Sequence, residues 1–269
     1  MTSKSLPSAL EPYLRLPVET SLILLTSTLG CSVNWLVARF VGNALSPKTS
    51  EGDESPAVLL VSWMRDLNFW KNEIRRTTGV DLTKSTTTGH FAFVDCFSSP
   101  SPTSTVLSEA EKNIQQALAK FSTDQKVLLV LDNPDILLAT ASTTAQDLNT
   151  FVLNLRSHSQ VHATYLSASA DLPLVSATVT ETRIPVEAET AAFVASQAHA
   201  SRLLFSVREL ETGAAKDVSG VLRITRGGDY YDLDDDEDED SEAVKEAELL
   251  YLVQRDGNVK VFGRGADAS

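Results

Sequence analysis

The sequence predicts an α/β protein in which a mostly parallel central sheet is followed by antiparallel strands near the carboxyl end. Short apolar runs alternate with amphipathic segments along the first two thirds of the chain, which is typical of successive βαβ units. The last third carries closely spaced strand-like segments, and Asp256-Gly257 marks a tight hairpin turn between two of them. Because βαβ units are right-handed, we expect helices on both faces of the sheet.

The parallel part of the sheet is expected from short apolar runs that are rich in valine and leucine. These strands are predicted at 21–26, 57–63, 91–95, 126–132 and 161–167. Amphipathic helices are predicted between them, at 33–45, 66–79, 106–121 and 144–157. In the last third we expect strands at 176–185, 201–209, 220–226, 249–254 and 259–263. Residues 187–200 fit either a short helix or an edge segment. No boundary separates two domains, so a single domain over 1–269 is predicted.

The charge of the chain is concentrated in one place. Ten acidic residues and no basic residue lie between Asp229 and Glu242, so without them the formal net charge changes from −13 to −3. A run of this kind cannot be buried, and we predict a solvated, disordered insertion at about 229–247. A docking site for a basic partner is the alternative interpretation.

The composition excludes several classes of protein. Two cysteines, Cys31 and Cys96, are too few for a disulfide framework or a thiolate metal cage, which favours a reducing compartment, the cytosol or the nucleus. No apolar run approaches the ~18 residues of a membrane span, and no secretory signal pattern is expected. His158 and His162 have metal-ligand spacing, but no third ligand accompanies them, so no metal site is predicted.

The segment between the first strand and the first helix lies where a nucleotide-binding protein carries its phosphate loop. Such a loop has the pattern G-x-x-x-x-G-K-[ST], whose amides and lysine hold the phosphates. Residues 25–32 read LTSTLGCS here, so Gly30 and Ser32 fit the pattern. Leu25 replaces the first glycine and Cys31 replaces the lysine, and a thiol cannot neutralise phosphate charge. We therefore expect no nucleotide cofactor at this degenerate loop.

Two further positions bear on nucleotide chemistry. Asp132 ends the most strand-like segment and resembles the carboxylate that supports magnesium in such folds, the Walker B position. The strand at 57–63 ends in Ser62-Trp63-Met64, where a water-activating glutamate would be needed. The pattern indicates an NTPase fold without NTPase chemistry. An active ATPase with an irregular phosphate loop stays open as the alternative.

Several segments together resemble a known family. They are VLLVSWMRDLNFWKNEIRRTTGVDL at 58–82, VLLVLDNPDILL at 127–138, DVSGVLRITRGG at 217–228 and ELLYLVQRDGNVKVFGRG at 248–265. The most specific features are Arg65, Asp66, Phe69 and Trp70 after a strand, and a VLRITRGG strand separated from a carboxyl-terminal hairpin by an acidic insert. In these features the chain resembles the sixth subunit of the Elongator complex.

The resemblance implies a RecA-like fold with a degenerate phosphate loop. It also implies assembly with the fourth and fifth Elongator subunits into a hetero-hexameric ring with two copies of each chain. That ring binds tRNA and docks on the catalytic part of Elongator, which begins a carboxymethyl-type modification of the wobble uridine, U34. The chemistry belongs to the acetyl-CoA- and iron–sulfur-dependent catalytic subunit, so this chain is expected to have no catalytic residue and no cofactor of its own. A cytoplasmic location is expected, and the same resemblance implies presence in the nucleus as well.

Candidate contact residues follow from the chemistry that such a subunit needs. Protein interfaces are enriched in aromatic residues and arginine, which favours Arg65, Phe69, Trp70 and Arg75 as partner contacts. Trp70 also has the spacing of a core residue. The loops after Asp132 and Ser167, expected at the ring centre, contain no basic residue. Since phosphate contacts need lysine or arginine, Arg223 and Arg226 are the candidate tRNA contacts.

Overall fold

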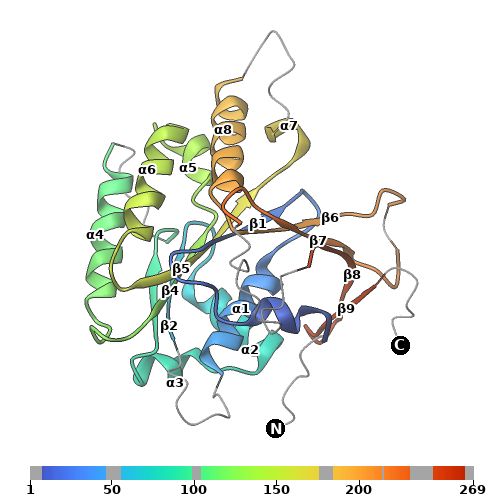
Figure 1. The fold of residues 1–269 in the computed structure, drawn as a ribbon, viewed down its shortest axis with the longest axis horizontal. Helices are drawn as coiled ribbons and strands as arrows, with labels where there is room; N and C mark the ends of the chain where they lie inside the picture. The colour runs from blue at the N-terminus through green and yellow to red at the C-terminus, as the bar shows by residue number, and fades with distance from the viewer. Residues whose placement is uncertain are drawn as a thin grey trace, which may run out of the picture.

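The computed structural model describes residues 8–46, 56–98, 104–175, 184–213, 215–230 and 245–263. Nine strands in these residues form one sheet in the order β3-β2-β4-β5-β1-β6-β7-β8-β9 (Figure 1). The strands are β1 (Leu22–Ser27), β2 (Ala57–Ser62), β3 (Phe91–Asp95), β4 (Val127–Asp132), β5 (Val161–Ser169), β6 (Leu203–Arg208), β7 (Gly220–Arg226), β8 (Ala247–Val253) and β9 (Val259–Gly263).

The first six strands form the parallel part of the sheet. β1 lies between β5 and β6, and β4 lies between β2 and β5, with parallel pairing throughout. This arrangement brings the carboxyl ends of β1, β2, β4, β5 and β6 to the same edge. In an open α/β sheet, ligands bind at that edge, which makes it the first place to look for a site.

Helices cover both faces of the sheet, as the sequence predicts (Figure 1). One core packs η1 (Ser8–Leu14), α1 (Asn34–Leu45) and α2 (Leu67–Thr78) against one face of the sheet. The other packs α4 (Val106–Leu118), α6 (Ala145–Arg156) and α8 (Pro185–His199) against the opposite face. None of the helices in the described ranges is long and apolar enough to cross a membrane. The shorter helices are α3 (Leu82–Thr87), α5 (Ile136–Thr140) and α7 (Leu172–Val175).

Local signals in the sequence set the ends of the longer helices. α2 begins after Asp66, whose side chain accepts a 2.8 Å hydrogen bond from the Phe69 amide, and it ends at Gly79 with φ 83°. α6 begins with a capping box in which Thr144 and Asp147 satisfy each other's amides. These caps account for the agreement between the predicted and observed bounds of both helices.

The carboxyl-terminal strands are antiparallel, as predicted. β7 pairs antiparallel with β6, β8 with β7, and β9 with β8. The hairpin between β8 and β9 turns at Gly257, which has φ 82°, and a Cβ at this position would come within 2.2 Å of Arg76. Glycine is therefore needed here both for the turn and for the close approach of α2.

Three sequence expectations need correction or fall outside the description. The strand predicted at 176–185 is wrong at its end, because Ile184 caps α8 and Pro185 is its first residue. Residues 176–183, and most of the predicted acidic insertion, lie outside the described residues. The predicted insertion, 229–247, extends too far at its carboxyl end, because Ala247 already belongs to β8 and pairs with Ile224.

Candidate functional site

The degenerate phosphate loop connects β1 to α1 at the carboxyl edge of the sheet. Gly30 adopts φ 87°, and the Cys31 amide donates to the Thr28 carbonyl at 3.0 Å, which closes a tight turn. The Asn34 amide donates to Oγ of Ser32 at 3.1 Å, just inside α1. The turn thus keeps the strand–loop–helix layout that the sequence predicts for residues 25–32.

Two carboxylates lie on this loop, and the sequence analysis had not singled them out. Oδ1 of Asp171, which follows β5, accepts a hydrogen bond from the Leu29 amide at 2.5 Å. Glu209, which follows β6, lies so close to Gly30 that a Cβ there would be 2.0 Å from Glu209 Oε1. A phosphate loop offers its amides to an anion, whereas here one amide already binds a carboxylate and a second acid lies beside it. The charge at this site therefore opposes phosphate.

Cys31 supplies no positive charge in place of the missing lysine. Burial raises the pKa of its thiol, and the negative charge of Glu209 raises it further, whereas a hydrogen bond with Tyr251 lowers it. Tyr251 is buried and lies 5.1 Å from Trp35, ring centre to ring centre. Both rings line a cavity of about 400 Å³ between the loop, α2 and β8. The loop thus borders a cavity whose walls combine aromatic rings with the Glu73–Arg76 ion pair.

Asp132 ends β4 at the same edge and is 1% exposed. Its Oδ2 accepts a 2.6 Å hydrogen bond from Ser62 at the end of β2, and its Oδ1 accepts one of 3.1 Å from Ser167 on β5. Burial raises the pKa of this carboxyl above its usual value, while the two serine hydroxyls and the nearby Arg65 partly oppose that shift. Asp132 therefore joins three strand ends in a closed hydrogen-bonded group, which gives it a structural role in this conformation.

A second buried carboxyl, Asp135, lies one turn further along. Its Oδ2 accepts the Ser169 amide at 2.9 Å, and its Oδ1 accepts Asn133 Nδ2 at 3.3 Å. Burial raises the pKa of Asp135 as it does that of Asp132. Asn133 has φ 51°, a left-handed conformation that asparagine tolerates and that turns the chain sharply after β4. The Asn-Pro-Asp sequence after an apolar strand could have indicated this turn.

The described residues hold no metal-binding group of three or more histidine, cysteine or acidic side chains. Of the two spaced histidines, His162 lies in β5, and its Nε2 is 2.9 Å from the Pro17 carbonyl oxygen. That contact explains the histidine as part of the packing of the segment that follows η1.

Comparison with known proteins bears on the fold. No family model and no curated protein matches the chain. Among solved structures, the chain is similar to a KaiC-like protein from the hyperthermophilic archaeon Pyrococcus horikoshii OT3. The TM-score is 0.55 with 14% sequence identity, and the match covers 91% of this chain and 90% of that chain. The fold is RecA-like.

Within this RecA-like fold, the predicted partner contacts separate into two groups. Arg75 is exposed, and the half-buried Arg65 lies over the ring of Phe69 at 5.2 Å from its centroid. Trp70, by contrast, is 0% exposed and packs edge-on against Phe69. Its burial removes Trp70 from the surface contacts, because the helix face that carries Leu67, Trp70 and Ile74 is the one turned to the core.

The predicted tRNA contacts lie on β7, two strands from β1 in the sheet. Arg226 pairs in register with Leu203 at the start of β6, at the edge of the sheet opposite to Asp132. Its guanidinium lies 4.3 Å from the Tyr230 ring centroid, and that of Arg202 lies 4.9 Å from the same centroid. Arg223 is exposed in the middle of β7. The structure thus places Arg202 and Tyr230 beside Arg226, whereas Arg223, three residues earlier on the strand, points to the opposite face of the sheet.

Proposed function

We propose that this chain is a non-catalytic RecA-like subunit of the Elongator complex. In this role it assembles with the fourth and fifth subunits into a hetero-hexameric ring that binds tRNA and supports modification of the wobble uridine. The proposal rests on the RecA-like fold together with the Elongator-like segments at 58–82, 127–138, 217–228 and 248–265. The likeness to the archaeal KaiC-like protein supports the fold component alone.

One observation carries the non-catalytic part of the proposal. The loop that would hold phosphate has a neutral Cys31 where a lysine is required, and it has Asp171 hydrogen-bonded to its Leu29 amide. A nucleotide triphosphate brought to this loop would meet these carboxylates in place of a lysine. Arg76 lines the cavity beside the loop, but its guanidinium is already paired with Glu73 at 2.7 Å. A subunit with such a loop contributes its surfaces to an assembly rather than ATP turnover.

The surfaces available for assembly lie on α2 and on the outer strands. α2 presents Arg75 and the half-buried Phe69 beside Arg65, a combination of aromatic and arginine side chains that is typical of interface centres. β7 presents Arg223 and Arg226, which could contact tRNA phosphates. Because the loops after Asp132 and Ser167 contain no basic residue, the partner subunits would supply most of the contacts to tRNA.

Native mass spectrometry after co-expression with the fourth and fifth Elongator subunits of the same source tests the proposal. We expect a species that contains two copies of each chain. A matched pair of variants sharpens the result: Arg75→Glu should reduce the amount of assembled ring, whereas Lys112→Glu on the exposed face of α4 should not. If the wild-type chain stays alone at micromolar concentration, the proposal is wrong.

An active ATPase with an irregular phosphate loop is the second candidate. It is favoured by the left-handed Gly30 in a strand–loop–helix turn and by Asp132 at the end of β4. Magnesium-dependent ATP binding that Asp132→Ala abolishes would support it over the assembly role.

A further inference from the structure

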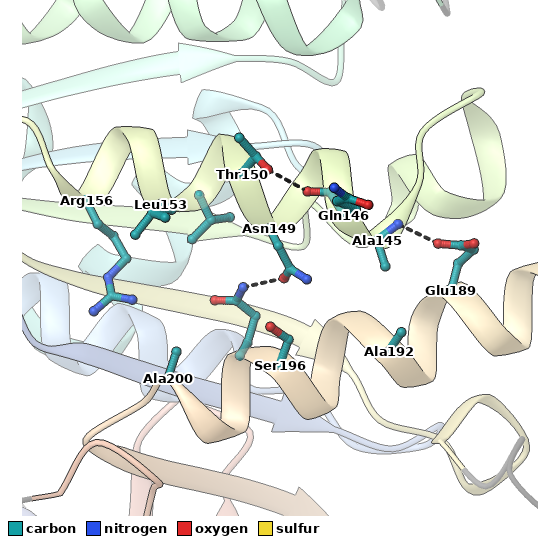
Figure 2. Close-up of a pocket in the computed structure, with 12 residues that line it drawn as sticks. Ala145, Gln146, Asn149, Thr150, Leu153, Arg156, Glu189, Ala192, Ser196 and Ala200 are labelled. Carbon is teal, nitrogen blue, oxygen red and sulfur yellow. Dashed lines mark hydrogen bonds between the residues drawn. The ribbon is translucent and has the colours of Figure 1, made fainter.

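A groove of about 540 Å³ runs between α6 and α8 on the face of the sheet opposite to α1 and α2 (Figure 2). On the α8 side its wall is made of small residues, Ala192, Ser196 and Ala200, which recur every four residues and so share one face of the helix. On the α6 side lies Leu153, which is 58% exposed. Small residues along one wall let another backbone approach closely.

The floor of the groove contains a buried polar atom without a partner. Gln197 is 4% exposed, and its Nε2 donates a 2.7 Å hydrogen bond to Oδ1 of Asn149 on α6. Its Oε1 has no hydrogen-bond partner among the described residues. A buried carbonyl oxygen left unpaired is costly, so a rotation of the Gln197 side chain that lets an occupant of the groove donate to Oε1 would be favourable.

The two ends of the groove carry opposite charges. Glu189 lies at one end, where its carboxylate accepts the Ala145 amide at 2.5 Å (Figure 2). Arg156 lies at the other end beside Ala200, and its guanidinium donates to the Thr20 carbonyl at 3.0 Å. Since Ala145 and Glu189 lie near the starts of their helices, α6 and α8 run in the same direction. Their negative carboxyl ends therefore lie together, next to Arg156.

These features select one kind of occupant. A helix that runs antiparallel to α6 and α8 would place its positive amino end near their negative carboxyl ends. Acidic residues, which favour the first turn of a helix, would then lie beside Arg156, and basic residues of the last turn would lie beside Glu189. α6 is 12 residues long, so at 1.5 Å per residue the groove accepts about three turns of helix.

We propose that this groove binds a helix of a partner protein, antiparallel to α6 and α8. That helix turns small or aliphatic residues and one hydrogen-bond donor toward Gln197, and it carries acidic residues in its first turn and basic residues in its last. The inference does not depend on the proposed function, because it identifies the partner by its chemistry alone. A small molecule or a second copy of this chain would be a different occupant.

The test uses the full chain and a capped, fluorescently labelled peptide of about 15 residues, close to the length at which isolated helices become marginally stable. The peptide has an alanine–leucine face with one central glutamine, glutamates in its first turn and lysines in its last. Fluorescence anisotropy should report binding with a Kd in the micromolar range. Ser196→Trp fills the groove from an exposed position and should weaken binding at least about tenfold, a loss of about 1.4 kcal/mol. Gln116→Trp, an equally exposed position on α4, should leave the Kd unchanged.

A second comparison isolates the predicted orientation. Glu189→Gln keeps an oxygen that can accept the Ala145 hydrogen bond but removes the charge. It should weaken binding of the lysine-ended peptide about threefold, because that peptide loses an electrostatic contact with the carboxylate. A matched glutamine-ended peptide makes no such contact and should bind as before. Circular dichroism of each variant establishes that it is folded as the wild type is.

Three outcomes would overturn the proposal. The first is absence of peptide binding to the wild type at millimolar concentration, and the second is equal affinity for the wild type and Ser196→Trp. The third is concentration-dependent dimerisation of the chain in analytical ultracentrifugation that Ser196→Trp abolishes, because the occupant would then be a second copy.

Discussion

The backbone N–H of Leu29 and the carboxylate of Asp171 form a 2.5 Å hydrogen bond at the loop between β1 and α1. In a RecA-like fold that retains a phosphate loop, amides of this turn face the nucleotide. Here the loop after β5 supplies the anion from within the chain, and Glu209 from the loop after β6 adds a second negative charge beside Gly30. The site therefore resembles a phosphate loop in backbone course and opposes phosphate in charge.

This charge arrangement makes a prediction about engineered nucleotide binding. We expect the isolated chain to bind MgATP no more tightly than about 1 mM, and Cys31→Lys alone to leave that value unchanged. The lysine would be neutralised by Asp171 and Glu209 before it could reach a phosphate. Adding Asp171→Asn and Glu209→Gln to Cys31→Lys should tighten binding about tenfold or more, as measured by isothermal titration calorimetry. Micromolar binding by the wild type would contradict this account.

The reactivity of the two cysteines is a second prediction. Burial raises the pKa of Cys96 to about 12, and the pKa of Cys31 is also raised, so both thiols stay protonated at pH 8 and should react slowly with iodoacetamide. Glu209→Gln removes a negative charge near Cys31 and should increase its alkylation rate severalfold. The rate at Cys96 serves as the internal control and should not change. Equal rates at Cys31 in the two proteins would contradict the placement of Glu209.

Asp132 leads to a prediction about pH and stability. Its pKa is raised in the folded state, so the folded chain binds the proton more tightly than the unfolded chain does. The resulting stability is fully present below the unfolded pKa of about 3.9 and is lost as the pH rises through the folded pKa. Asp132→Asn removes this titration and keeps one oxygen acceptor. The weaker hydrogen bonds to Ser62 and Ser167 should lower the free energy of unfolding by about 1 kcal/mol.

Urea unfolding of both proteins at several pH values between about 4 and 7.5 measures the difference in free energy of unfolding. The advantage of the wild type over Asp132→Asn should be largest at the acidic end and should shrink as the pH rises. Titrating groups that do not interact with Asp132 cancel in this difference, whereas Asp135, whose charge acts on Asp132, contributes to it. An advantage that grows with pH would mean instead that Asp132 is ionised and stabilised by its two serines.

Most of the fold could be predicted from the sequence because its strands and helices carry local signals. The apolar runs at β1, β2 and β4 are buried on both faces, and α2 and α6 have caps that the sequence contains in full. The strand predicted at 176–185 is wrong at its end, where valine and threonine nearby suggest a strand but Pro185 is well placed as the first residue of a helix. Short elements such as α5 and α7 have too few residues to produce a periodic pattern.

The candidate site was only half predictable, for a physical reason. The departures at Leu25 and Cys31 were predictable, because the phosphate-loop motif is a pattern of neighbouring residues in the sequence. Asp171 and Glu209 reach the same loop from 142 and 179 residues further along the chain, through the pairing of β5 and β6 with β1. No spacing rule in a single sequence connects residues that far apart, so the carboxylates could be found only from the sheet order.

The buried Trp70 and the exposed Arg75 are expected to behave as opposites when they are changed. Trp70→Ala leaves a cavity beneath α2 and should lower the free energy of unfolding by about 3–5 kcal/mol, measured by urea denaturation. Arg75→Ala removes an exposed side chain and should change it by less than about 0.5 kcal/mol. In the assembled ring, Arg75→Ala should lower the yield of hexamer without lowering the melting temperature of the isolated chain. A normal yield with Arg75→Ala would remove this residue from the interface.

The contribution of β7 to RNA binding is measurable in the assembled ring with purified tRNA. The double variant Arg223→Ala/Arg226→Ala loses two exposed guanidiniums, so the affinity should fall, and the slope of log K against log salt should become shallower by about one for each lost phosphate contact. Lys112→Ala on α4 removes an exposed charge far from β7 and is the matched control. An equal loss in the control would indicate a general effect of net charge. An unchanged slope in the double variant would mean that the partner subunits hold the tRNA without β7.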